Sequence, residues 1–176
     1  MSEPVDVNHY PPLGLDDAGL KKELEALLTA RAPGNAYSSD GSFSATLATL
    51  PVGLRAMAAT HCLDISLTLD SIIWHFGNFG EPGLVEQTEA GLRELGLHEL
   101  AKCFSDAKHM MLPLLAHRKV EDGNPYEILE RAGRRDEADK IKRRAWDLDN
   151  LGRGKSVIYE AWIRYTREHP DRVFAT

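Results

Sequence analysis

The feature that most constrains this chain is a run of apolar residues at helical spacing in its first half. The members recur at intervals of four and three residues and are Ala58, Cys62, Ile65, Leu69, Ile72 and Phe76. This spacing places them on one face of an α-helix, and Pro51 suits the first turn of that helix. Because Leu63, Leu67 and Trp74 add a second apolar flank, we expect a long helix over about residues 51–76 at the centre of the fold.

Helical spacing also dominates the rest of the chain. Helix-start residues precede apolar stripes near Asp16, Pro82 and Pro125, and further stripes occupy residues 97–111, 138–148 and 158–169. Gly96 occupies the position of a helix-ending glycine. No stretch has an alternation of period two long enough to predict a strand. The sequence therefore predicts an all-α fold, a bundle of six to eight helices around the long central helix.

Length and composition indicate one domain. The chain has 176 residues, of which 43% are hydrophobic and 27% charged, as in ordinary globular proteins. A chain of this size can bury about 70% of its unfolded surface without a disulfide or a metal. We expect residues 1–14, MSEPVDVNHYPPLG, to form an extended N-terminal arm and residues 15–176 to form a single helical domain.

The same sequence features indicate a cytoplasmic protein. The first residues lack the basic and apolar regions of a secretory signal. Charged residues interrupt the apolar stretch around residues 54–76, which argues against a membrane span. Cys62 and Cys103 belong to no paired motif, so we expect two buried, reduced thiols.

Charge is unevenly distributed along the chain. The net charge is −6, made of −9 over residues 1–107 (15 acids, 6 bases) and +3 over residues 108–176 (12 acids, 15 bases). This distribution disfavours direct nucleic-acid binding and leaves room for a basic protein partner at the acidic end.

The most prominent acidic cluster has only Arg93 and Lys102 close to it in sequence. Its five members are Glu81, Glu86, Glu89, Glu94 and Glu99. They are candidates for contact with a basic partner, although a solvated surface is the alternative. The basic residues between 134 and 144 alternate with acids, which is typical of a solvated helix.

The best candidate for chemistry is a polar stripe along the predicted central helix. His61, Asp64 and His75, with Thr68 and Ser71, share this stripe and could line a pocket or form an acid–base pair. The two histidines are some four turns apart on one helix, at roughly 5.4 Å a turn, so they cannot meet at one metal unaided. A hydrogen-bonded seam between helices is the simpler interpretation.

No motif for a metal, a cofactor or a catalytic nucleophile is present. The histidines form no zinc or di-iron pattern. Residues 152–156 read Gly-Arg-Gly-Lys-Ser, like the end of a phosphate-binding loop, but position 149 carries Asp where that motif needs Gly. We therefore expect no metal and no cofactor, and we expect Ser156 to cap the last helix.

Two segments resemble a family of small, acidic, all-helical bacterial proteins that includes a DNA mimic. They are Trp74-His75-Phe76-Gly77-Asn78-Phe79-Gly80-Glu81, with the helix ending in Leu95-Gly96, and the C-terminal Leu148-Asp149, Tyr159, Ile163-Arg164-Tyr165 and His169-Pro170, closed by Phe174. The family's Asn-Gly-Gly turn falls on Leu69-Asp70-Ser71, where continuing helix is predicted. The resemblance implies an all-α fold and, for one member, carboxylates arranged like DNA phosphates.

Together these features favour a non-enzymatic protein-interaction module. Its acidic face, Glu81 to Glu99, would bind a basic partner such as a DNA-binding protein. One alternative is an enzyme or small-ligand binder that uses His61, Asp64 and His75. Another is a structural homodimer, with Trp146 or Trp162 exposed at its interface.

Overall fold

The computed structural model describes residues 9–116, 118–119, 122–149 and 154–175, and this part of the chain is helical without any strand. The elements are a 3-10 turn η1 (Pro11–Gly14) and the helices α1 (Asp17–Arg31), α2 (Ser42–Ala48), α3 (Val52–Leu69), α4 (Ile72–Asn78), α5 (Pro82–Glu94), α6 (His98–Leu115), α7 (Pro125–Arg131), α8 (Arg135–Asp149), α9 (Val157–Glu168) and α10 (Asp171–Phe174). The predicted all-α class is confirmed for the described residues.

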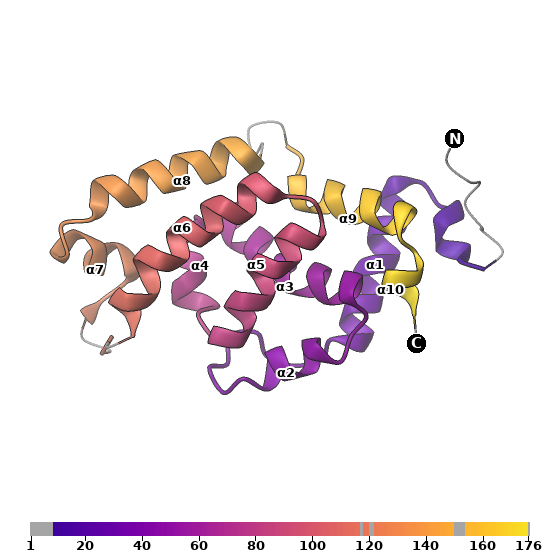
Figure 1. Cartoon of the computed structure of the whole chain (residues 1–176), viewed down its shortest axis with the longest axis horizontal. Coiled ribbons are helices and arrows are strands. Elements are labelled where there is room, and N and C mark those ends of the chain that lie inside the picture. Colours follow the sequence, from indigo (N-terminus) through magenta and orange to yellow (C-terminus); the bar gives the residue numbers. More distant parts are fainter. Residues whose placement is uncertain (1–8, 117, 120–121, 150–153, 176) are drawn as a thin grey trace.

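Helix α3 is the most deeply buried element. It packs against α1, α2, α4, α5, α8, α9 and α10. Figure 1 shows α1, α9 and α10 gathered at one end of the molecule and α7 and α8 at the other, with α3 to α6 between them. The N-terminal half of α3 is apolar or small on nearly every side, from Gly53 to Thr60, and these side chains are almost all buried.

The predicted long helix over residues 51–76 is wrong, because the chain breaks at Asp70 and Ser71 to give two helices. Asp70 has φ −151° and ψ −86°, and Ser71 has the extended values φ −168° and ψ 167°. The hydroxyl of Tyr126 in α7 contacts the carboxylate of Asp70, at 3.1 Å, and the hydroxyl of Ser71. Short polar side chains of this kind favour backbone turns over helix interiors.

The break also reverses the expected burial of one residue in the apolar stripe. Leu69 was expected to face the core, but its side chain is 79% exposed at the end of α3. The apolar periodicity continues across the break, since Ile72 and Phe76 are both buried in α4. Periodicity alone therefore could not show where one helix ends and the next begins.

The other helix limits follow local chemistry. Gly96 ends α5 with φ +76°, and the bonds from Leu97 N to Leu92 O and from Gly96 N to Arg93 O form the predicted Schellman ending. The side chains of Asp16 and Ser156 cap α1 and α9 as predicted. Helix α6 contains Pro113 and continues to Leu115, past the predicted apolar stripe over residues 97–111.

The described residues form more helices than the six to eight predicted, partly because the predicted long helix is divided and partly because two short helices were not expected. Helices α2 and α10 were not predicted, and both have few residues, seven and four. Within the predicted extended arm, residues 11–14 form the 3-10 turn with Leu13 buried, while residues 1–8 lie outside the described residues. No helix in the described part of the chain is both long enough and apolar enough to cross a bilayer.

The close contact of α9 and α10 with the start of α3 gives a first prediction. A methyl group on Gly53 would lie 2.7 Å from Tyr165 Cε1, 2.8 Å from the Arg172 carbonyl oxygen and 2.9 Å from Val173 Cγ2. Gly53→Ala is expected to lower the free energy of unfolding by about 1–3 kcal/mol in urea denaturation, because overpacking outweighs the better helix propensity of alanine. Gly14→Ala, where nothing lies within 4 Å, is the control, and equal stabilities would contradict the expectation.

Candidate functional site

The five glutamates of the predicted acidic face have different roles in the fold. Glu81 caps α5, since its carboxylate accepts hydrogen bonds from Gly83 N at 2.9 Å and Leu84 N at 2.7 Å. Glu94 accepts a hydrogen bond from the Tyr165 hydroxyl and pairs with Arg172 at 2.8 Å. Glu99 is exposed in the first turn of α6.

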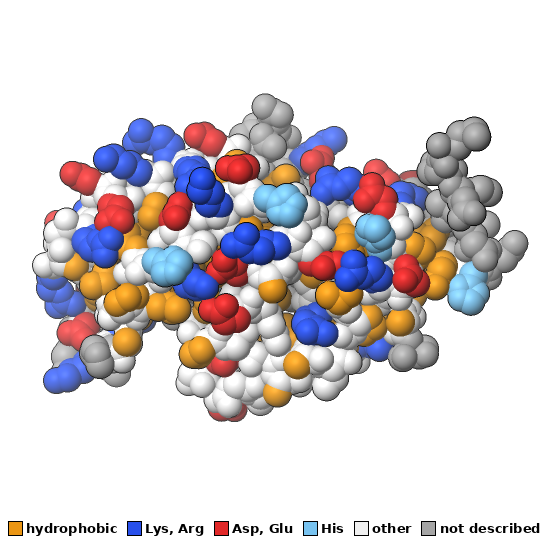
Figure 2. All heavy atoms as spheres, viewed as in Figure 1, with side chains coloured by type: hydrophobic (Ala, Val, Ile, Leu, Met, Phe, Trp, Pro, Cys, Tyr) orange, Lys and Arg blue, Asp and Glu red, His pale blue; other side chains and the backbone are white. Residues whose placement is uncertain are grey.

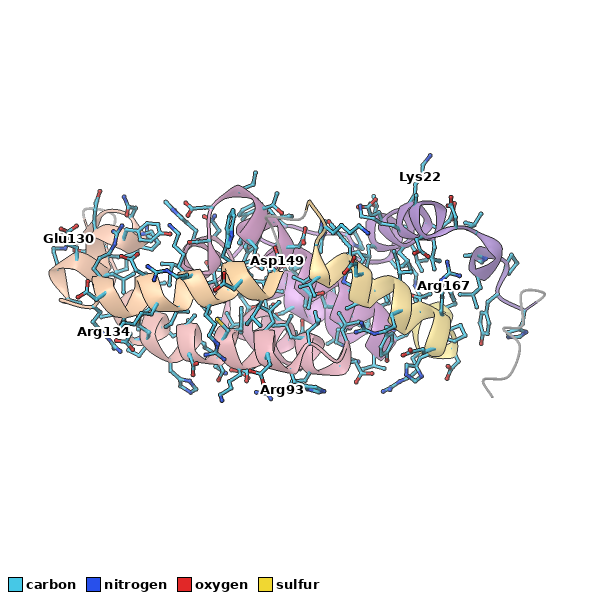
Figure 3. All side chains as sticks on the ribbon, turned by 90° about the horizontal axis from the view of Figure 1, so that it is seen from above. Lys22, Arg93, Glu130, Arg134, Asp149 and Arg167 are labelled. Carbon is cyan, nitrogen blue, oxygen red and sulfur yellow. The ribbon has the colours of Figure 1, made fainter. Side chains whose placement is uncertain are left out.

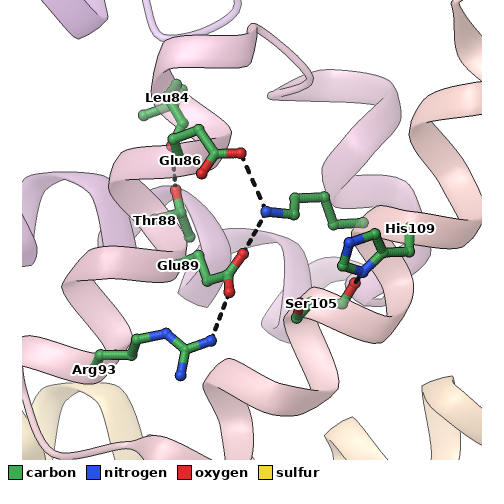
Figure 4. A network of polar contacts seen from close by, with 8 residues as sticks. Leu84, Glu86, Thr88, Glu89, Arg93, Ser105 and His109 are labelled. Carbon is green, nitrogen blue, oxygen red and sulfur yellow. Dashed lines mark hydrogen bonds and ion pairs between the residues drawn. The ribbon is translucent and has the colours of Figure 1, made fainter.

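Glu86 and Glu89 belong to one charged network with Lys108 of α6 (Figure 4). Lys108 Nζ lies 2.6 Å from Glu89 and 3.1 Å from Glu86, and Arg93 lies 2.6 Å from Glu89. Partial burial alone would raise the pKa of Glu89, but the hydrogen bonds from Lys108 and Arg93 bring it below its ordinary value. Glu86 remains open to solvent, with a side chain 70% exposed.

The sequence argument that only Arg93 and Lys102 compensate this face is therefore wrong. Lys108 and Arg172 come from other helices and pair with three of the glutamates, Glu86, Glu89 and Glu94. Figure 2 shows basic and acidic side chains interspersed on the side of the molecule that carries α5 and α6. Sequence proximity could not reveal these pairs, because the partners are far apart along the chain.

The three residues of the predicted polar stripe lie in different environments; they are His61, Asp64 and His75. His61 is half-buried, with its Nδ1 3.1 Å from the Tyr159 hydroxyl. Asp64 is buried beneath α9 and accepts a hydrogen bond from Ser156 Oγ. Because the helix breaks at residue 70, His75 lies on α4 rather than four turns farther along the helix that carries His61.

His75 is enclosed in an aromatic cluster. Its ring centroid lies 5.5 Å from that of Phe76 and 5.3 Å from those of Phe79 and Phe104. Its Nδ1 lies 3.2 Å from Ser66 Oγ, and its Nε2 has no hydrogen-bond partner among the described residues. Burial lowers the pKa of His75 to about 3, so the imidazole is neutral at physiological pH.

A buried carboxylate near Asp64 was not predicted as a site residue. Asp149 ends α8, where Figure 3 shows it close to the start of α9. It is fully buried, and neither carboxylate oxygen has a hydrogen-bond partner among the described residues. Burial, together with the charge of Asp64, raises the pKa of Asp149 to about 7.

A groove runs along the outer side of α3, and we call it the α3 groove. It consists of two adjoining hollows of about 340 and 250 Å³ that share Tyr37, Ile65 and Phe79. His61 and Glu25 lie in the first hollow, and Leu69, Asp70 and Trp74 lie in the second; the remaining lining residues are mainly apolar. Tyr37 packs on Phe79 with a centroid distance of 4.7 Å and is 61% exposed.

A third hollow lies between the helix break and α8, and we call it the α8 pocket. It has a volume of about 280 Å³ and is lined by Leu67, Asp70, Ser71, Ile72, Asp139, Lys142, Arg143 and Trp146. Trp146 is 52% exposed, which fits the predicted exposure of this residue. Trp162, the other residue considered for a dimer interface, is instead fully buried and donates a hydrogen bond to Thr60 Oγ1 at 3.1 Å.

The remaining reactive groups are enclosed. Cys62 and Cys103 are buried free thiols, as predicted, and burial raises the pKa of Cys62 to about 12 and that of Cys103 to about 11. Thiols in such surroundings are weak nucleophiles. Among the described residues no group of three or more His, Cys, Asp or Glu side chains could hold a metal ion.

Sequence reasoning missed both the α3 groove and the α8 pocket. Cys62, Ile65 and Leu69 of the groove were assigned to the core, because an apolar stripe does not show which part of it stays uncovered. His61, which lines the first hollow, had been proposed as a pocket residue, but with Asp64 and His75 as its neighbours. For the α8 pocket a pattern was available, since Asp139, Lys142, Arg143 and Trp146 follow the spacing i, i+3, i+4, i+7 on one helix face. A tryptophan on an otherwise charged helix face, Trp146, is the sequence feature that indicates this pocket.

Comparisons of the chain with protein-family models, curated proteins and solved structures gave no match.

Asp149 gives a prediction about stability and pH. Its pKa is raised from an ordinary 3.8 to about 7 in the folded state. Its contribution to stability is therefore fully present below about pH 4 and is lost as the pH rises to about 7. Asp149→Asn is expected to match the wild type near pH 4 in urea unfolding and to exceed it at pH 8, because asparagine resembles the protonated acid. Asp147→Asn, exposed on the same helix, is the control; no gain for Asp149→Asn at pH 8 would refute the assignment.

His75 gives the opposite pH dependence. Its pKa is lowered from 6.5 to about 3, so its contribution is complete above pH 6.5 and is lost on acidification towards pH 3, by up to about 1.4 kcal/mol per pH unit. His75→Phe, which keeps an aromatic ring in the cluster, is expected to gain stability relative to the wild type as the pH falls from 6.5 to 4. The measurement is the difference in urea unfolding free energy at each pH. A difference that stays constant over this range would show that His75 does not titrate as inferred.

Proposed function

We propose that this protein is a protein-interaction module that binds an apolar segment of a partner in the α3 groove. The observation that carries the proposal is the exposure of a large apolar side chain, Leu69, in line with Ile65 on the uncovered side of α3. Contiguous apolar surface of this kind, bordered by polar residues, is typical of interaction sites. Tyr37 and Trp74 flank the stripe, and exposed aromatic side chains are common anchors in protein interfaces.

The proposed occupant is an amphipathic helix of another protein with basic residues beside its apolar face. A groove that presents a helical stripe flanked by aromatic side chains fits side chains spaced i, i+3 or i+4 on a bound helix. The charged lining residues within the described chain are Glu25 and Asp70, and neither hollow is lined by a lysine or an arginine. Glu25 is already paired with Lys21 at 2.6 Å, so Asp70 is the carboxylate of the groove that favours a cationic partner.

The proposed partner is basic, as expected from the charge distribution, but it binds in the α3 groove rather than on the acidic face from Glu81 to Glu99. A DNA-binding protein, the partner considered from the charge distribution together with the family resemblance, is one source of such a basic helix. The break at Asp70 and Ser71 falls at the position where the resembled family has its Asn-Gly-Gly turn.

The acidic face formed by α5 and the first turn of α6 is a second candidate surface, favoured by the exposure of Glu86 on α5 and Glu99 on α6. A homodimer fits the groove less well. Symmetric dimers need a self-complementary patch, and two concave surfaces leave a void when they face each other. His61 faces the groove without Asp64 or His75, so it would contact the bound segment rather than act in an acid–base pair.

The test uses two labelled model helices, one of leucine and lysine and one of leucine and glutamate, with binding followed by fluorescence anisotropy. The leucine–lysine helix is expected to bind the wild type, and the leucine–glutamate helix to bind much more weakly. Leu69→Glu is expected to weaken binding of the leucine–lysine helix at least about tenfold, a loss of about 1.4 kcal/mol. Leu69 is exposed, so this change leaves the core intact.

The matched control is Thr68→Glu, which adds the same charge to the neighbouring residue outside the groove lining. Added negative charge by itself attracts a basic peptide, so weaker binding in Leu69→Glu alone identifies the groove. The double variant Glu86→Lys/Glu99→Lys belongs to the same series. If the double variant abolishes binding while Leu69→Glu does not, the partner contacts the acidic face of Glu86 and Glu99 instead of the groove. Light scattering of the free protein shows whether the protein self-associates.

A further inference from the structure

One face of α8 carries positive charge that the fold does not neutralise. Three arginines of this segment pair with carboxylates: Arg134 with Glu137 at 2.6 Å, Arg135 with Asp139 at 3.6 Å, and Arg144 with Asp106 at 2.7 Å. Lys142 and Arg143, in contrast, have no carboxylate partner among the described residues. Lys142 lies 5.4 Å from the centroid of the Tyr126 ring, a contact that leaves its charge uncompensated.

These two cations line the α8 pocket together with apolar groups. Leu67 and Ile72 are buried residues from either side of the helix break, and Trp146 lies one turn after Lys142 and Arg143 on the same face of α8. A large, half-exposed indole ring beside two free cations combines an apolar contact surface with an anion-binding edge.

Of the two acids of the pocket, only Asp139 has a cationic partner. Asp139 pairs with Arg135, whereas the partner of Asp70 is the neutral Tyr126 hydroxyl at 3.1 Å. Lys142 and Arg143 outnumber this one carboxylate, so the unpaired charge of the pocket is positive on balance. The volume of about 280 Å³ accommodates one aromatic or branched group and is too small for a dinucleotide.

We infer that the α8 pocket binds an apolar carboxylate, whose hydrocarbon part contacts Trp146, Leu67 and Ile72 and whose anionic group pairs with Lys142 and Arg143. Arg143 can hold a carboxylate through two parallel hydrogen bonds, while Lys142 supplies a second point charge. Such a group occurs in a free aromatic acid or at the C-terminus of a peptide that ends in an apolar residue. The inference does not depend on the α3 groove, since the cations and the indole come from α8.

The test uses 1-naphthoate and its neutral amide, 1-naphthamide, in calorimetric titrations with the full chain. Naphthoate is expected to bind the wild type at least about tenfold more tightly than naphthamide, because only the acid pairs with the two cations. Lys142→Gln/Arg143→Gln is expected to remove this preference while leaving the weak binding of naphthamide unchanged. Equal affinities for the two compounds in the wild type, or an unchanged preference in the double variant, would overturn the inference.

The matched control is Lys22→Gln/Lys140→Gln, which changes the net charge equally at exposed lysines outside the pocket lining. It is expected to keep the preference for naphthoate within about twofold, and a loss as large as that of the pocket variant would attribute binding to overall charge. In ¹⁵N NMR spectra, naphthoate is expected to shift the indole signal of Trp146, assigned with Trp146→Phe. A shift confined to Trp74 would place the ligand in the α3 groove and contradict the inference.

A second pair of ligands separates the two sources of the carboxylate. A short peptide ending in phenylalanine is compared as the free acid and as the C-terminal amide. Tighter binding of the acid form than of naphthoate assigns the pocket to peptide C-termini, and weaker binding assigns it to free aromatic acids. Binding of neither naphthoate nor the peptide acid would refute an anion site, whatever the leucine–lysine helix shows for the α3 groove.

Discussion

The arrangement of the molecule depends on the break between α3 and α4 at Asp70 and Ser71. The Tyr126 hydroxyl contacts both residues of the break from α7, and the contact between Ser66 Oγ and His75 Nδ1 joins the two helices directly. With the break in place, α4 packs against α3, α6, α7 and α8 at once. The same break leaves Leu69 in solvent and makes Asp70 part of both the α3 groove and the α8 pocket.

The uneven charge of the sequence is largely compensated by folding. Cations from the basic part of the chain, residues 108–176, pair with acids of residues 1–107: Lys108 with Glu89, Arg144 with Asp106, Arg167 with Asp17 and Arg172 with Glu94. Lys108 and Glu89 are largely buried, whereas more exposed pairs such as Arg144–Asp106 and Arg167–Asp17 each contribute only about 0–1 kcal/mol. The main effect of the exposed pairs is therefore on the electrostatic surface rather than on stability. The acidic end inferred from sequence is consequently a mixed surface, and the uncompensated cations Lys142 and Arg143 lie on α8.

Local chemistry in the sequence predicted much of the fold, whereas the functional surfaces depend on contacts between distant residues. The caps at Asp16 and Ser156 and the ending at Gly96 were predictable, because each involves hydrogen bonds within a few residues. The break at residue 70 was predictable only in part: Asp70 and Ser71 favour turns, but Tyr126, which contacts the Asp70 carboxylate, is 56 residues away along the chain. Likewise, whether Ile65 and Leu69 are covered depends on where α1 and α4 lie, which no periodicity encodes.

The two buried titratable groups, His75 and Asp149, have a joint effect on the exchange of protons with the solvent. Their pKa values are displaced in opposite directions, to about 3 and about 7. Between about pH 4 and pH 6.5, unfolding releases the proton held by Asp149 and lets His75 take one up, so these two groups together exchange no net proton with the buffer. Their contributions to the pH dependence of stability cancel over this range. A flat stability profile there would thus be the sum of two steep, opposing titrations, one on α4 and one at the end of α8.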